Sequence, residues 1–165
     1  MQAFIELILT RGYEGLSAQQ VAARAGVGRS TFYVHFGGLG AMLEAGLEVP
    51  CAVLAASVRS ASPASDLAAL MGHFRQHWVR NRGFFCEPVL SLWVRRLSRD
   101  IALSLRRDPD CSRQRPVIAR ECLAPLLAEL QLSMIRGWLA AGAKASPESI
   151  AQTVRAVTGR LLYGI

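Results

Sequence analysis

Lysine is almost absent from this sequence, because Lys144 is the only lysine among the 19 basic residues and the rest are arginine. Cysteine is also sparse: the four cysteines lie far apart, with no CxxC pair and no His/Cys cluster at zinc-ligand spacing. The sequence therefore predicts free thiols in a reducing cytoplasm, no metal site and no cofactor. No run of about 18 uncharged apolar residues occurs, so no membrane span is expected.

The basic surplus is unevenly distributed along the chain. The 165 residues carry a formal net charge of +7, which makes nucleic acid a candidate partner. Residues 1–48, however, hold only Arg11, Arg24 and Arg29 against four glutamates, a net charge of −1. The surplus of basic residues lies after residue 48. These residues either form a solvated face or raise the electrostatic potential around DNA or an anionic ligand. Net charge alone does not identify the part that meets DNA.

Apolar residues recur at spacings of three and four along nearly the whole chain, whereas β-branched alternation is rare. With 52% hydrophobic residues the chain can bury a core, and we predict an all-α fold. The first expected helix, Met1–Arg11, ends at Gly12. The second, Ala18–Ala25, begins with Ser17 and Gln20 in a capping box.

The turn Gly26-Val27-Gly28 separates the second helix from a third, Arg29–His35. Two short helices joined by a three-residue turn are typical of a helix-turn-helix. The apolar contacts expected between them come from Val21, Ala22, Ala25, Phe32 and Phe36, with Val27 filling the turn.

The remainder of the chain predicts longer helices. Their expected spans are Ala41 to about Ser60, Asp66 to about Asn81 with Ser65 as its cap, Pro88 to Asp108-Pro109-Asp110, Pro116–Ala143 with Pro125 kinking or dividing it, and a last helix that starts at Ser146-Pro147-Glu148.

Residues 3–47 closely resemble the DNA-binding region of TetR-family transcriptional regulators. The motifs that carry the resemblance are RGYEGLS at residues 11–17, VAARAGV at 21–27 and, above all, GRSTFYVHF at 28–36. The rest of the chain is similar in outline, as a helical domain that ends in two long helices. The resemblance implies a helix-turn-helix head over residues 1–48 and a larger effector-binding and dimerisation domain over residues 49–165.

Three features depart from the family's usual pattern. Gly37-Gly38-Leu39-Gly40 stands where the family commonly has a lysine after the His-Phe pair. Gly28 replaces the hydroxyl cap of the recognition helix, and Met1 falls where the family's first helix is already under way. The departures at residues 37–40 and at Met1 lower the expected affinity for phosphate, which the two heads of a dimer can offset.

A two-turn helix exposed at the surface fits the major groove, where its side chains reach base edges and phosphates. Arg29 and Thr31 are expected to contact a base edge or a phosphate, and Tyr33 and His35 to donate to phosphates. Ser17 and Gln19 are expected to lie beside a phosphate at the start of a helix. The predicted DNA-binding residues are Ser17, Gln19, Arg29, Ser30, Thr31, Tyr33 and His35.

Aromatic residues in the second domain predict an apolar effector pocket. Its expected lining is Phe74, His77, Trp78, Phe85, Ser91 and Trp93. His73 and His77 lie one turn apart, and without a third ligand they are interpreted as core or pocket residues, not as a metal site. The expected dimer interface, on the last two helices, comprises Leu127, Leu130, Met134, Trp138, Ile150, Val154, Val157 and Leu161.

These patterns predict a cytoplasmic homodimeric regulator that is released from operator DNA by a small, mainly apolar effector. Repression is implied by the family resemblance. The alternative is a dimeric ligand-binding or partner-binding protein whose DNA-binding head is degenerate, as the missing lysine and the acidic head suggest. An enzyme is not expected, because the sequence contains no nucleophile elbow, phosphate loop or metal motif.

Overall fold

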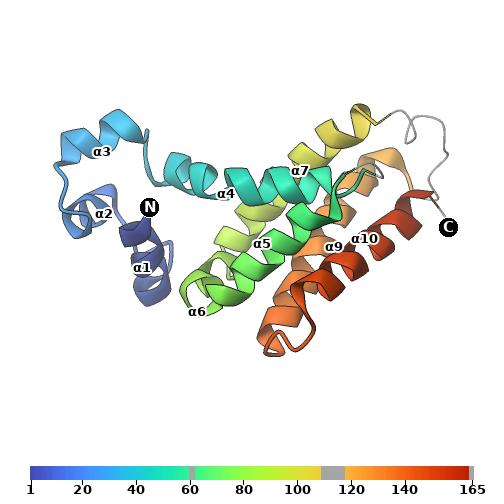
Figure 1. The fold of residues 1–165 in the computed structure, drawn as a ribbon. Coiled ribbons are helices and arrows are strands. Elements are labelled where there is room, and N and C mark those ends of the chain that lie inside the picture. Colours follow the sequence, from blue (N-terminus) through green and yellow to red (C-terminus); the bar gives the residue numbers. More distant parts are fainter. Residues whose placement is uncertain (60–61, 109–117, 164–165) are drawn as a thin grey trace.

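The structure is a computed structural model that describes residues 1–59, 62–108 and 118–163. All regular structure in these ranges is helical, as predicted (Figure 1). The elements are α1 (Gln2–Arg11), α2 (Ala18–Arg24), α3 (Arg29–His35), α4 (Leu39–Ala56), α5 (Ala64–Gln76), α6 (Trp78–Asn81), the 3-10 turn η1 (Arg82–Phe85), α7 (Val89–Arg106), α9 (Arg120–Ala140) and α10 (Pro147–Tyr163).

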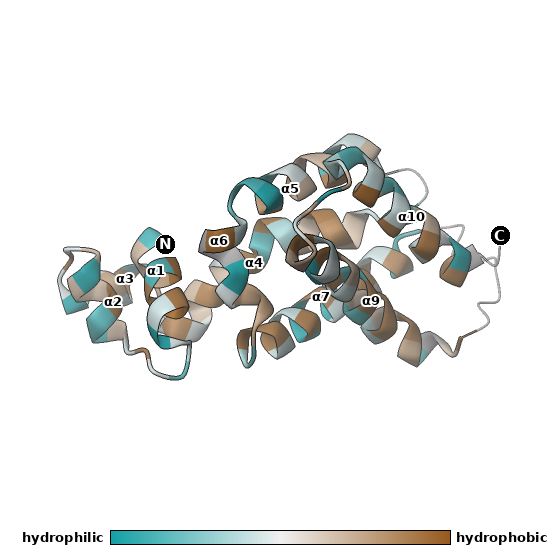
Figure 2. Ribbon diagram, turned by 90° about the horizontal axis from the view of Figure 1, so that it is seen from below, coloured by the Kyte–Doolittle hydropathy of each residue, from teal (hydrophilic) through white to brown (hydrophobic). Residues whose placement is uncertain are grey.

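The helices form a small head and a larger body. Helices α1, α2 and α3 gather at one end of the molecule, and α4 leads from them along the body (Figure 1). In the body, α7 packs between α4 and α9, and α10 packs on α5 and α9. Polar and apolar residues alternate along these helices, as expected for amphipathic helices around a shared core (Figure 2).

Local capping explains the head's helix boundaries. Helix α1 ends where Gly12 takes a positive φ of 71°, and α2 begins with the predicted capping box. In that box the Gln20 amide N–H donates to Ser17 Oγ at 3.2 Å, and the Ser17 amide donates to Gln20 Oε1 at 2.8 Å. Helix α3 starts after Gly28 without a side-chain cap. The predicted bounds are confirmed to within one residue.

Several predicted boundaries in the body were wrong. The expected helix from Asp66 to Asn81 begins earlier, at Ala64 after Pro63, and ends at Gln76, so Ser65 lies within it and does not cap it. His77, with φ −112° and ψ 17°, interrupts the helix. The chain then turns through α6 and η1, which allows Phe84 and Phe85 to be buried. Aromatic burial therefore overrides the continuous helical pattern.

Two further expectations concern prolines and helix ends. Helix α4 spans Leu39–Ala56, shifted from the predicted span, and α7 ends at Arg106. Pro125 lies inside α9, which continues through it as one helix. The helix start expected at Pro116 lies outside the described residues, as do Pro109 and Asp110.

Helix α4 is the one helix in the described residues that is long and apolar enough, by length and composition, to cross a membrane. It packs along α7 and buries six residues in the core. Its Glu44 carboxylate pairs with Arg96 of α7. In this fold α4 therefore serves as a core helix, and it connects the head to the body.

Candidate functional site

The head brings α2 and α3 together around a small apolar core. Val21, Ala22 and Phe32 are each less than 5% exposed, as predicted. Ala25 is exposed and Val27 is 41% exposed, so the expectation that these two pack inside was wrong. The turn is closed by backbone bonds instead: Gly26 and Val27 donate to the carbonyls of Ala23 and Ala22 at 3.1 and 3.0 Å.

Helix α3 presents a continuous exposed surface at the tip of the head. Tyr33 is 45% exposed, and its ring packs edge-on against buried Phe32 with centroids 5.4 Å apart. The Arg29 guanidinium lies 5.7 Å from the centre of the Tyr33 ring. Packing thus presents Arg29 and Tyr33 together. The exposed residues of this surface are Arg29, Ser30, Thr31, Tyr33, Val34 and His35.

The two predicted contacts at the start of α2 differ in their surroundings. The Ser17 hydroxyl is engaged in the capping box, where it also donates to Gln20 Oε1 at 3.1 Å. Gln19 is exposed. At this helix start the Gln19 side chain is thus exposed, whereas the Ser17 hydroxyl already has a partner within the chain.

Helix α1 contacts α2 within the head and also packs against the body. Within the head, Arg24 Nη2 of α2 lies 2.5 Å from Glu6 Oε2 of α1. Toward the body, α1 packs on α6 and η1. A Cβ at Gly83 of η1 would lie 2.6 Å from Ile8 Cγ2, so the glycine permits this close approach. Helix α1 therefore contacts both the rest of the head and the body.

A cavity of about 570 Å³ lies at this junction. The head contributes Ile5 of α1, α4 contributes Leu47, and the aromatic side chains of the body form much of the remaining wall. The ring centroids of Phe85 and Trp93 lie 4.8 Å apart, and those of Phe74 and Trp93 lie 5.9 Å apart. The polar side chains in the lining are Asp66, His73 and His77.

Four of the six predicted pocket residues line this cavity: Phe74, His77, Phe85 and Trp93. Trp78 and Ser91 do not. Trp78 packs against Phe85 with centroids 5.6 Å apart, and the Ser91 hydroxyl donates to Glu87 Oε2 at 2.6 Å. Sequence reasoning missed the walls from α1 and α4, because no local pattern shows that helices so far from residue 74 fold against it.

The His73 and His77 rings lie 4.7 Å apart, close to the cavity. Across residues 1–59, 62–108 and 118–163, no group of three His, Cys, Asp or Glu side chains is placed to hold a metal ion. Both histidines belong to the lining of the cavity.

The eight predicted interface residues fall into two sets on α9 and α10. Leu127, Trp138, Ile150 and Val154 are buried within the chain itself, and the Trp138 indole N–H donates to the Ala145 carbonyl at 3.1 Å. These four residues therefore belong to the core of this chain. The partly exposed set is Leu130, Met134, Val157 and Leu161.

A three-helix head with an exposed recognition helix, joined by α4 to a larger helical body, defines a helix-turn-helix DNA-binding protein. Residues 1–45 match the family model described as "Bacterial regulatory proteins, tetR family". Residues 1–45 are therefore a DNA-binding region of the TetR family of transcriptional regulators.

Solved structures support the same fold. The chain is similar to Thermus thermophilus FadR, a TetR-family transcriptional repressor in complex with lauroyl-CoA, with 20% identity, a TM-score of 0.56, and coverage of 94% of this chain and 89% of that one. It is also similar to a TetR-like regulator from Rhodococcus sp. RHA1, with 18% identity, a TM-score of 0.53, and coverage of 99% and 93%. A comparison with curated protein sequences gave no match.

Proposed function

We propose that this regulator is a cytoplasmic homodimeric repressor that a small, mainly apolar effector releases from its operator. Residues 1–48 bind DNA, and residues 49–165 bind the effector and form the dimer through α9 and α10. The observation that carries the proposal is the junction cavity, whose wall includes Ile5 of the DNA-binding head as well as Trp93 of the body.

On the operator, α3 lies in the major groove of each half-site. Arg29 contacts a guanine edge or a phosphate, and Thr31 contacts either kind of group, helped by Ser30. Tyr33 and His35 donate to phosphate oxygens, while Ser17 and Gln19 approach the backbone at the start of α2. The exposure of all these side chains supports this assignment.

The cavity supports an effector with a long apolar part. Its volume of about 570 Å³ lies within the range of small-molecule sites, and Phe74, Phe85 and Trp93 supply aromatic walls. His73 and His77 suit a polar end group. The Thermus thermophilus FadR structure contains lauroyl-CoA, and an acyl chain belongs to the class of ligand that we propose for this cavity.

Release of DNA requires the effector to prefer one arrangement of head and body over another. An effector in the cavity touches α1 and α4 on one side and α5 and α7 on the other. It therefore favours a particular spacing between these helices. In the arrangement that the effector favours, the distance between the two α3 helices of the dimer does not match the distance between the half-sites. Effector binding therefore weakens operator binding, and operator binding weakens effector binding.

The first test is selection of bound sequences from a random DNA pool by the purified protein, with the Arg29→Ala/Tyr33→Ala double variant in parallel. We expect a palindromic motif for the unmodified chain only. Failure to enrich any motif contradicts operator binding by this chain.

The second test adds lauroyl-CoA to the complex with the selected operator. We expect release of DNA, and loss of this release in Ala69→Trp, which places an indole in the cavity lining. The matched control is Val79→Trp, at a position that is 74% exposed and outside the lining. Equal release by both variants excludes the junction cavity as the effector site.

A further inference from the structure

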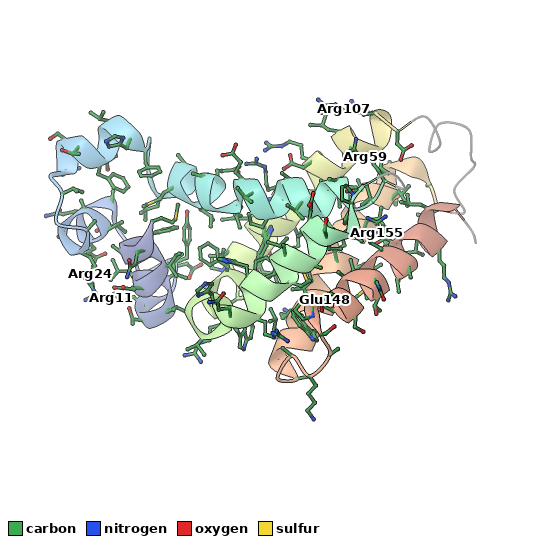
Figure 3. The ribbon with its side chains drawn as sticks, viewed as in Figure 1. Arg11, Arg24, Arg59, Arg107, Glu148 and Arg155 are labelled. Carbon is green, nitrogen blue, oxygen red and sulfur yellow. The ribbon has the colours of Figure 1, made fainter. Side chains whose placement is uncertain are left out.

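A second hollow, of about 270 Å³, lies between α7 and the carboxyl-terminal part of α4. It shares no lining residue with the junction cavity. Figure 3 shows Arg59 and Arg107 at the same end of the body, where these two helices finish. The lining comprises Ala52, Ala55, Ala56, Arg59, Asp100, Leu103, Ser104 and Arg107.

Arg59 carries a donor that the described part of the chain leaves unpaired. Its Nε atom is buried, and no hydrogen-bond acceptor lies within reach among the described residues. A buried donor of this kind normally has a partner, because an unpaired donor loses its hydrogen bond to water without gaining another. An acceptor placed in the hollow from outside would supply that partner.

The charges around the hollow favour an anion. The Asp100 carboxylate is already paired, with Arg96 Nε at 2.8 Å and Arg99 Nε at 3.6 Å. Arg96 also pairs with Glu44. These two carboxylates are thus balanced by two arginines of α7, and Asp108 does not line the hollow. Arg59 and Arg107 remain as the cationic groups of the lining.

We propose that this hollow binds a small organic monophosphate. Guanidinium groups match the geometry of phosphate oxygens, and Arg59 and Arg107 supply two of them, with the Ser104 hydroxyl as a further donor. The three alanines and Leu103 form an apolar surface for the organic part of the ligand. Neither the cationic groups nor the apolar surface of this hollow depends on the binding of operator or effector.

Phenyl phosphate is the probe, titrated into the purified chain by calorimetry beside inorganic phosphate and neutral benzyl alcohol. We expect phenyl phosphate to bind more tightly than inorganic phosphate and benzyl alcohol to give no saturable signal. Arg59→Gln and Arg107→Gln each weaken phenyl phosphate binding by about tenfold or more, because each removes a charge-assisted hydrogen bond. Arg160→Gln, on exposed α10 surface, leaves the affinity unchanged.

Arg107 is exposed, so its replacement leaves the fold intact and decides the question even if Arg59→Gln unfolds the chain. The Ala69→Trp variant, altered at the junction cavity, retains phenyl phosphate binding. Unchanged affinity in Arg107→Gln, absence of saturable binding at millimolar probe, or equal affinity for inorganic phosphate each overturns the proposal.

Discussion

Gly83 of η1 and Ile8 of α1 lie so close that a Cβ on the glycine would be 2.6 Å from Ile8 Cγ2. Ile8 is 4% exposed, and its neighbour Leu9 is also within 3.4 Å of that Cβ position. The DNA-binding head therefore rests on the body at a contact with no room for another carbon atom.

Gly83→Ala is expected to lower the free energy of unfolding by about 1–3 kcal/mol, because the added methyl group overpacks a filled site. Urea denaturation measures the loss. The double variant Ile8→Ala/Gly83→Ala tests the cause, because the alanine at position 83 then fits the space left by Ile8. We expect the double variant to lose less free energy of unfolding than the sum of the losses in the two single variants. If the losses in the two single variants simply add, the destabilisation by Gly83→Ala does not come from its contact with Ile8.

Tyr33→Phe is expected to weaken binding to the selected operator about tenfold, because it removes the hydroxyl that we propose donates to a phosphate. The ring stays packed on Phe32, so the melting temperature should not change. Fluorescence anisotropy with labelled operator measures the affinity. Tyr13→Phe is the matched control, since Tyr13 is half-buried against Phe4. Equal affinities for both variants would remove Tyr33 from the DNA interface.

Gly37→Lys should strengthen operator binding and increase the slope of log affinity against log salt by about 0.9, the value for one added phosphate contact. Position 37 is exposed and an added Cβ meets nothing within 4 Å, whereas Leu39 is half-buried at the start of α4. Gly37→Gln adds length without charge and should leave the slope unchanged. A slope that is the same for lysine and glutamine would show that this loop faces away from DNA.

Burial, reinforced by the nearby Asp100 carboxylate, raises the pKa of the Cys51 thiol to about 12. Cys51 should therefore remain a protonated thiol at pH 8, where alkylation needs the thiolate. Cys86 and Cys122 are exposed. Brief iodoacetamide treatment followed by mass spectrometry is expected to label these two, and to label Cys51 only after denaturation in urea. Labelling of Cys51 in the folded chain at the rate of Cys122 would contradict its burial.

Local signals accounted for the head because its helix ends depend on residues close in sequence. The Ser17 and Gln20 capping box, the positive φ of Gly12 and the turn after Ala25 are all local features. The inward packing of Val27 failed because backbone hydrogen bonds, not a side chain, close the turn. In the body, the break at His77 depended on burial of Phe84 and Phe85 against distant helices, which helical spacing does not reveal.

The sequence by itself determined the all-α class, the helix-turn-helix head and the exposed face of α3, since helical periodicity and capping act over a few residues. Only the tertiary structure decided which residues surround the two hollows. Ile5 and Trp93 share one cavity, and Arg59 and Arg107 share the other, although each pair is far apart in the chain. Such pairings arise from how amphipathic helices pack on one another, and that packing depends on the whole core at once.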